Sequence, residues 1–498
     1  MSSAVSQKKI GKLFTIYSSG RAVGMLFSVL LIPLFAREMP QAEFGFIGIL
    51  WFIIPLLSRA MNLGLDAALG MKFFKLTHQE RSLYLYNVLL CTVAIGVAIM
   101  AVGLWKINWI QFAIGLQMTR NGYFFLILAV FFSICVTITQ AFFQYEGKAV
   151  KNIIFSICPP VIITVTTYLL VCYVDKNYIS YLKGLVLGYG IFTIVGILYF
   201  LKKYSLNCFY VSLPVIKQLL RIGWPTIPST VGGILLASGD RYVIKWALGL
   251  NAVAVYTYGY RFAEYVASMF LEPYQKALGP ILMNEAAKDS DKASCYNADV
   301  VYTNSVFFPI LVGLIIVPMK NIMFWLGGAK YIQSYWIFLL AVIGILFFHV
   351  RQISSIILNH FERADLNMYI VIGAALLNLV LNICLVPKYG IIMAAVTTII
   401  CYFLMLFSTI FIANFLMSTR INLRKVLVRI LPFLVFISGV FYMDWFADGF
   451  SAFQSCSLKF LMFLIMFCVM FIFEEMRKGV ARIGPFGKHK DCSLKVLT

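Results

Sequence analysis

Long apolar segments follow one another along almost the whole chain. From Phe14 to Phe473 they recur as stretches of about 20 residues, separated by short polar breaks. A helix of this length crosses a bilayer, whereas the strands of a transmembrane barrel are alternating segments of about 10 residues. The pattern predicts an all-α polytopic membrane protein with about 14 transmembrane helices, arranged as two six-helix lobes plus two C-terminal helices. The expected spans are Phe14–Ala36, Phe44–Leu69, Leu83–Leu104, Tyr123–Tyr145, Ile153–Val174, Ile179–Leu201, Ile222–Leu248, Ala252–Met283, Val300–Met319, Ile332–Leu358, Met368–Pro387, Ile391–Met417, Ile430–Phe446 and Ser455–Phe473.

The composition supports this class. The 498 residues are 61% hydrophobic and 12% charged, against roughly 25% charged in soluble domains. No cleavable signal peptide is evident, so the first span is expected to remain. The phosphate-binding motif GxxxxGK[ST] is absent, which argues against an ATP-driven pump. Transport energy is therefore expected from a gradient, the membrane potential or the substrate's own concentration difference.

The basic charge follows membrane topology. The net charge is +21, from 41 Lys and Arg and 20 Asp and Glu. Of the basic residues, 25 belong to one set of loops, 10 to the opposite set or the span ends beside it, and six lie deeper inside spans. Because basic loops stay in the cytoplasm, both termini are expected there, and nucleic acid is not needed to explain the charge. The 11 cysteines form no CxxC pair, so neither a metal site nor a cofactor is expected.

A weak internal repeat divides the chain. Basic amphipathic segments, Lys8–Phe14 and Val215–Arg221, lead into spans one and seven, and five-residue turns, Met39–Glu43 and Leu248–Ala252, follow those spans. Parallel repeats of this kind build many transporters. The expected domains are an N-terminal lobe at 1–201, a C-terminal lobe at 202–417, two additional helices at 418–474 and a basic cytoplasmic tail at 475–498.

Charged residues inside the spans are the main functional signal, because charge in a bilayer is expensive and normally faces a wet cavity or a partner. The predicted substrate-binding cations are Arg21, Arg59, Arg241, Arg261, Lys276 and Arg351. The intramembrane carboxylates, candidates for coupling or gating, are Asp66, Asp240, Glu264 and Glu272.

The strongest pattern lies in Val255–Pro280. Measured from Arg261, the polar residues Glu264, Ser268, Glu272, Gln275 and Lys276 follow at spacings of 3, 7, 11, 14 and 15, which form one stripe on an α-helix. On span two, Arg59, Asn62 and Asp66 share a face in the same way. These stripes predict a polar path through the membrane.

Two interpretations of the charges stay open. In the first, a cationic cavity between the two bundles carries an anionic group, and the planar fork of arginine suits phosphate. In the second, Arg59–Asp66, Arg261–Glu264 and Glu272–Lys276 are ion pairs that hold helices together. His349 could relay protons or be a satisfied interior histidine. Asn378 and Asn382 suit sugar hydroxyls or helix–helix hydrogen bonds.

Span seven is expected to be bent or interrupted. Pro225 and Pro228 lie three residues apart and are followed by Gly232-Gly233. Proline removes a helical hydrogen bond and kinks the helix. Pro225 and Pro228 are therefore candidates for a gate, and a static kink is the alternative.

Three stretches resemble the Wzx-type polysaccharide or oligosaccharide flippases of the MOP exporter superfamily. Residues 30–45, which read LLIPLFAREMPQAEFG, are similar to that family's first hairpin. Asn62–Asp66 is similar to the end of its second span. Gly239–Ile244, with Leu248-Gly249 and Ala254–Tyr256, resembles its seventh and eighth spans.

The resemblance implies two six-helix lobes around a cationic lumen and alternating access. It implies that a polyprenyl-diphosphate-linked oligosaccharide, such as an O-antigen, capsule or exopolysaccharide unit, is moved from the cytoplasmic to the outer leaflet of a bacterial inner membrane. Membrane lipid, H⁺ or Na⁺ for coupling and a polysaccharide polymerase are the other partners it suggests. An enzyme is not expected.

Several alternatives stay open beside this interpretation. A small-molecule or drug exporter of the same superfamily would favour a carboxylate-rich cavity, and a peptidoglycan lipid precursor flippase is closer. A membrane glycosyltransferase or polymerase would need catalytic acids in a sizeable outer loop, whereas the first outer loop holds only Arg37, Glu38 and Glu43. A purely structural role leaves the charged stripe unexplained. The sequence does not specify the sugar, the coupling ion or the oligomeric state.

Overall fold

In the computed structural model, the regular secondary structure of the described residues consists of helices, with no strand among them. This confirms the all-α polytopic class. The structure describes residues 24, 27–73, 76–108, 111, 115, 117–203, 210–271, 290–360, 364–417, 421–446 and 451–472. Within these residues, 11 helices are long and apolar enough to cross a membrane. They correspond to 11 of the expected spans, and the remaining three are spans one, seven and eight.

The chain divides into two compact units, residues 1–254 and 255–498. The predicted boundary between residues 201 and 202, like the rest of the expected domain division, stays a prediction. The first unit contains α2 (Gln41–Asn62), α3 (Leu65–Lys72), α4 (His78–Trp105), α6 (Arg120–Tyr145), α7 (Ala149–Tyr173), α8 (Tyr178–Lys203), α9 (Leu213–Gly223), η3 (Trp224–Thr226), α10 (Ile227–Ser238) and α11 (Asp240–Leu248). The helix α12 (Leu250–Val266) begins in this unit and continues into the second.

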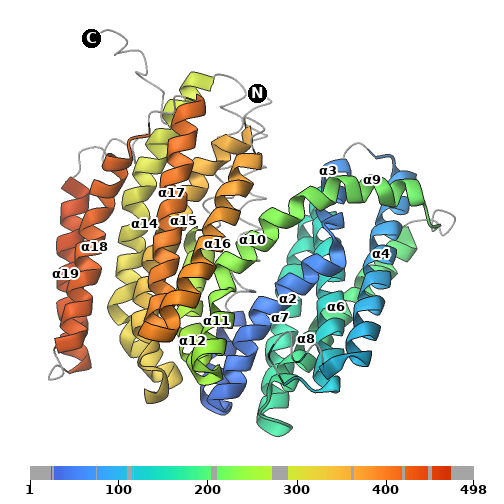
Figure 1. Ribbon diagram of the computed structural model, residues 1–498, viewed down its shortest axis with the longest axis horizontal. Coiled ribbons are helices and arrows are strands. Elements are labelled where there is room, and N and C mark those ends of the chain that lie inside the picture. The colour runs from blue at the N-terminus through green and yellow to red at the C-terminus, as the bar shows by residue number, and fades with distance from the viewer. Residues whose placement is uncertain are drawn as a thin grey trace. The chain divides into compact units, whose positions relative to one another are not determined.

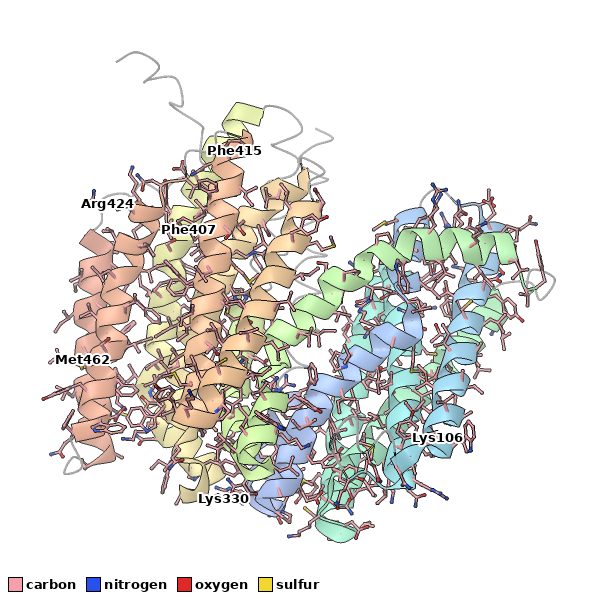
Figure 2. All side chains as sticks on the ribbon, viewed as in Figure 1. Lys106, Lys330, Phe407, Phe415, Arg424 and Met462 are labelled. Carbon is pink, nitrogen blue, oxygen red and sulfur yellow. The ribbon has the colours of Figure 1, made fainter. Side chains whose placement is uncertain are left out.

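The second unit is a bundle of long helices that lie side by side (Figure 1). After α12 it contains η4 (Ala267–Leu271), α14 (Ser290–Gly327), η5 (Ala329–Tyr331), α15 (Ser334–His360), α16 (Ala364–Tyr389), α17 (Ile391–Met417), α18 (Leu423–Phe446) and α19 (Ala452–Ile472). The helix α17 packs on both α15 and α16, while α18 and α19 pack on α14. In Figure 2, Phe407 and Phe415 lie along α17, and both are exposed, as expected for side chains that face lipid.

Local sequence explains where the helices begin. Thr77 and Glu80 form a capping box at the start of α4, in which each side chain bonds the other residue's backbone N–H. Thr119 caps α6 by accepting a hydrogen bond from the N–H of Gly122 at 3.0 Å. By contrast, Pro55 lies inside α2, which continues through it.

The second expected span is not one helix. The helix α2 ends at Asn62, Leu63 and Gly64 both take left-handed conformations with φ of 48° and 73°, and α3 starts at Leu65. The continuous face assumed for Arg59, Asn62 and Asp66 is therefore wrong, because two left-handed residues turn the chain between them. Glycine at 64 suits this turn, and asparagine directly before it favours a helix end.

The predicted interruption of span seven is present. The helix α9 ends at Gly223, Pro225 lies in the short 3₁₀ helix η3, and Pro228 occupies the first turn of α10. A further break at Gly239 separates α10 from α11. In Figure 1, α9 lies across the ends of the upright helices of its unit, and it packs on α3 and α4.

The eighth expected span changes its helical form. It is α-helical through Val266 and then becomes a π-helix from Ala267 to Leu271. A π-helix has a wider turn, so the α-helical spacing used for the charged stripe does not extend to Ser268. Glu272, Gln275 and Lys276 lie outside the described residues.

Candidate functional site

The described intramembrane charges of unit 1 lie at breaks between its helices. At the first break, Arg59 Nη1 lies 3.2 Å from Asp66 Oδ2 and 3.3 Å from Oδ1. The turn at Leu63 and Gly64 brings the two side chains together across the end of α2. The ion pair of the structural interpretation therefore forms, and about a third of the Arg59 side chain stays exposed.

The second break meets the first at the backbone. A Cβ on Gly64 would lie 2.4 Å from the carbonyl oxygen of Gly223, and a Cβ on Gly223 would lie 2.5 Å from the carbonyl oxygen of Gly64. Thr226 fixes the second break by donating its hydroxyl to the Gly223 carbonyl at 2.7 Å. Only glycine at both positions allows this approach, which positions the Arg59–Asp66 pair beside the start of span seven.

Asp240 and Arg241 lie at the third break, where α11 begins. Both side chains are buried, with exposed fractions of 1% and 0%. Asp240 Oδ1 accepts the backbone N–H of Arg241 at 2.7 Å, and its charge lies at the positive end of α11. Arg241 Nη1 reaches the carbonyl of Ala237 on α10 at 3.5 Å. Backbone groups on both sides of the break therefore hold the side chains of Asp240 and Arg241.

In unit 2, α12 carries the one pair of the charged stripe that can be described. Arg261 Nη1 lies 2.8 Å from Glu264 Oε2, one helical turn away. Both side chains are about three-quarters buried. Arg21, Glu272 and Lys276 lie outside the described residues, so the pairing expected for Glu272 and Lys276 stays a prediction.

Arg351 has a different environment. It lies on α15 with an exposed fraction of 4%. Its Nε donates to the hydroxyl of Thr409 at 3.2 Å, and its Nη2 donates to the side-chain oxygen of Asn367. Within the part of the chain that the structure describes, these partners are neutral and no carboxylate pairs with Arg351. Arg351 is therefore a buried cation held by neutral oxygens.

The other polar candidates of unit 2, His349, Asn378 and Asn382, form hydrogen bonds within and between its helices. His349 Nδ1 lies 2.9 Å from the carbonyl oxygen of Ile345 on its own helix. Asn382 donates to Asn378 at 2.9 Å and accepts from Thr397 at 2.7 Å. The bond to Thr397 joins α16 to α17, so of the two roles considered for the asparagines it matches helix–helix bonding.

A buried ionic cluster in unit 2 was missed by the sequence reasoning. Asp444 on α18 lies 3.0 Å from Lys320 Nζ on α14 and 2.7 Å from Lys459 Nζ on α19. Asp444 and Lys459 are almost completely buried. The available signal was that Asp444 and Lys459 fall within the expected spans Ile430–Phe446 and Ser455–Phe473, although both lie close to a span end.

Two acids of the loop expected on the outer side make structural contacts. Glu38 accepts a hydrogen bond from Lys176 at 2.9 Å, which raises the pKa of Lys176. Glu43 accepts the backbone N–H of Tyr178 at 2.8 Å. Both contacts tie the turn before α2 to the start of α8, which is the role expected of carboxylates at a helix terminus.

One protein family and one curated relative match most of the chain. A family model described as polysaccharide biosynthesis protein matches residues 34–335, more than half of the chain. The chain belongs to this family. An uncharacterized membrane protein from Methanocaldococcus jannaschii is 26% identical over 442 residues, which cover 82% of this chain and 85% of that protein. The predicted polysaccharide family, with the helical architecture it implies, is therefore confirmed.

Solved structures share the fold at low sequence identity. The Lipid II flippase MurJ, in an inward closed conformation, has a TM-score of 0.68 and 15% identity, with 90% of this chain and 99% of that chain covered. An inward-facing multidrug resistance MATE transporter of the MOP superfamily has a TM-score of 0.61 and 14% identity, with 82% and 94% covered. A MOP superfamily transporter from Pyrococcus furiosus, titled for the reverse polarity of its binding pocket, has a TM-score of 0.58 and 13% identity, with 82% and 96% covered.

Proposed function

We propose that this protein is a flippase that moves a polyprenyl-diphosphate-linked oligosaccharide from the cytoplasmic to the outer leaflet by alternating access. Membership of a polysaccharide biosynthesis family and a fold shared with a lipid flippase support a transporter of this kind. The product of such a step faces outward, so a polysaccharide polymerase would consume it. The bacterial inner membrane and cytoplasmic termini are part of the proposal.

The observation that carries the proposal is Arg351. A buried arginine whose described partners are the neutral oxygens of Thr409 and Asn367 provides positive charge without a resident carboxylate to cancel it. A guanidinium recognises a diphosphate well, because the phosphate oxygens match its planar fork. Arg21, Arg59, Arg241, Arg261 and Lys276 are proposed to line the rest of the path. Asp66, Asp240, Glu264 and Glu272 are proposed to couple transport to H⁺ or Na⁺, with Pro225 and Pro228 at a gate.

The test measures lipid-linked oligosaccharides by mass spectrometry in cells that lack the protein and receive variants. We expect wild type to clear an accumulated polyprenyl-diphosphate glycan. Arg351→Lys should clear it at least about tenfold more slowly, because lysine cannot make both side-chain bonds and a bond to a charged group contributes roughly 1.5–3 kcal/mol. Arg424→Gln is the matched control, since Arg424 is exposed at the start of α18 (Figure 2). Equal clearance by Arg351→Lys at equal membrane levels would overturn the assignment.

Variants of the Arg59–Asp66 pair distinguish a substrate-binding role of Arg59 from a structural one. Arg59→Gln alone leaves Asp66 without its partner, so a reduced protein level is expected from either interpretation. The double variant Arg59→Gln/Asp66→Asn removes both charges and should restore the level. If Arg59 binds substrate, clearance by the double variant stays low; if the pair only holds the turn, clearance returns with the level.

A peptidoglycan lipid precursor flippase is the second candidate, favoured by the 99% coverage of the Lipid II flippase MurJ at a TM-score of 0.68. The same mass spectra distinguish the two. Accumulation of a muropeptide-bearing lipid, with no change in other glycans, would favour this candidate. A small-molecule exporter, which the MATE transporter fold also allows, would change neither lipid.

A further inference from the structure

One end of unit 1 carries a fixed group of cations outside the charged interior. The turn between α6 and α7 is tight: Gly147 has a φ of 69°, and the N–H of Lys148 bonds the carbonyl of Phe143 at 2.9 Å. This turn places side chains from the end of α6 and the start of α7 beside the last residue of α8. We call the group the Tyr199 cluster, and its members are Glu146, Lys148, Lys151, Tyr199 and Lys203.

A buried carboxylate and a phenol hold two of the lysines. Glu146 is 8% exposed in its side chain and pairs with Lys203 and, at 2.8 Å, with Lys148. Lys148 also donates to the hydroxyl of Tyr199, which lies 3.4 Å from Glu146. Surface lysines usually sample many rotamers, whereas these ammonium groups are fixed before any ligand arrives.

Aromatic rings hold the remaining cations. Lys151 Nζ lies 4.2 Å from the ring centre of Tyr199 without an ion pair to Glu146 among the contacts of the described residues. Arg81, at the start of α4, lies over Phe73 at 4.4 Å; Phe73 packs against Phe142, and Lys203 Nζ lies 5.4 Å from the centre of the Phe142 ring. Two lysines pair with the one carboxylate and two further cations lie on neighbouring rings, so the local charge is positive.

The surface beside the cluster is apolar and suits a lipid. On α7, Val150 is 70% exposed and Ile154 is 45% exposed; on α8, Leu198 is 60% exposed and Leu201 is 45% exposed. These residues lie on the two helices that supply the lysines and Tyr199, within the first or last turns of each. A ligand that joins a negative headgroup to acyl chains would satisfy both surfaces, whereas free phosphate would satisfy only one.

We propose that the Tyr199 cluster is a binding site for the phosphate of an anionic phospholipid, whose acyl chains lie along α7 and α8. The end that carries it holds the basic loops assigned to the cytoplasm by the topology rule, so the lipid belongs to the cytoplasmic leaflet. The site is separate from the intramembrane arginines of the transport path. Its occupation stabilises the end of unit 1 where α6, α7 and α8 meet.

Lys151→Gln tests the proposal most cleanly, because Lys151 contacts the rings and leaves the Glu146 pairs intact. Native mass spectrometry of the full chain in detergent, titrated with phosphatidylglycerol or phosphatidylcholine, measures binding. We expect wild type to prefer phosphatidylglycerol and Lys151→Gln to bind it about fivefold more weakly, as loss of one basic residue near a membrane surface predicts. Phosphatidylcholine binding should not change.

Lys106→Gln is the matched control. Lys106 lies at the opposite end of α4 from α9 (Figure 2) and also stacks on an aromatic ring, 4.5 Å from that of Trp105. Its variant should bind phosphatidylglycerol like wild type. Equal losses in the Lys106 and Lys151 variants would overturn the proposal in favour of unspecific charge, and so would full displacement of the lipid by inorganic phosphate.

Glu146→Gln provides the opposite change. It removes the carboxylate that competes with a phosphate for Lys148 and Lys203 and adds one positive charge to the site, while the Tyr199 hydroxyl still holds Lys148. The gain in charge should offset the lost fixation of the lysines, so phosphatidylglycerol should bind at least as tightly as in wild type. Weaker binding by a folded Glu146→Gln protein would show that the carboxylate is required for the lipid contact and would contradict the proposed electrostatics. These measurements need no transport, so they stand or fall independently of the proposed flippase activity.

Discussion

Glycine at positions 64 and 223 allows two helix breaks of unit 1 to touch. Each would place a Cβ within 2.5 Å of the other's carbonyl oxygen, a separation that no side chain accepts without backbone movement. Gly64 additionally needs a φ of 73°. The contact joins the end of span two to the start of span seven, so the Arg59–Asp66 turn depends on it.

We predict that Gly64→Ala destabilises the protein more than Gly147→Ala. Both glycines have a positive φ at the end of a helix, which alone makes alanine about 1 kcal/mol unfavourable, but Gly147 has no atom within 4 Å of an added Cβ. The clash at Gly64 should add roughly 1–3 kcal/mol. Thermal unfolding of the purified protein, followed by size-exclusion chromatography, measures the difference. Equal midpoints for the two variants would mean that the breaks separate readily.

Single residues were predicted from sequence to different degrees. Arg59 and Arg351 stand out because a charge inside an apolar segment is visible in one dimension. Their partners were visible only where they are local: Asp66 is seven residues from Arg59, whereas Thr409 is 58 residues from Arg351. Hydropathy contains no information on such distant pairs.

Among the elements, α18 and α19 are held on α14 by a shared carboxylate. Asp444 contacts Lys320 of α14 and Lys459 of α19, and it belongs to α18 itself. Additional helices often pack by apolar contact alone, so a buried ionic cluster specifies where this pair docks. Asn321 supports the same junction through its 3.1 Å contact with Cys456.

Asp444→Asn should therefore destabilise the docking of α18 and α19. It leaves the buried Lys459 without a counter-charge, which costs about 3–5 kcal/mol in comparable buried pairs. Lys320→Gln should have a much smaller effect, because Lys320 is partly exposed and Asp444 keeps Lys459. Thermal midpoints and limited proteolysis in the loop before α19 would measure both. Similar shifts for the two variants would contradict the bridging role.

The long helices were the most predictable elements. Eleven expected spans contain a helix long enough to cross a membrane, and all but the second are continuous, because an apolar stretch of about 20 residues has no other stable form in a bilayer. Breaks were predictable where proline marks them, as at Pro225. The turn at Leu63 and Gly64 and the π-helix at Ala267–Leu271 were missed, because both interrupt segments whose hydrophobic pattern continues and neither contains a proline.

At the scale of the whole molecule, family and fold agree with the expectation from sequence. The polysaccharide biosynthesis match covers residues 34–335, and the shared fold extends over 90% of the chain. Neither the span pattern nor the helices specify the transported substrate, because sugars are bound by ordinary polar and aromatic side chains. The proposed substrate therefore rests on the proposed cationic path.

Reconstituted flipping is the most direct test of that central claim. Proteoliposomes would contain the full chain and a polyprenyl-diphosphate oligosaccharide with a fluorescent glycan, and an impermeant quencher added outside would report the protected inner pool. The account predicts that this pool drains at a rate that depends on the protein and falls at least about tenfold for Arg351→Lys. A protected pool that remains unchanged with folded wild-type protein, under imposed H⁺ and Na⁺ gradients, would contradict it.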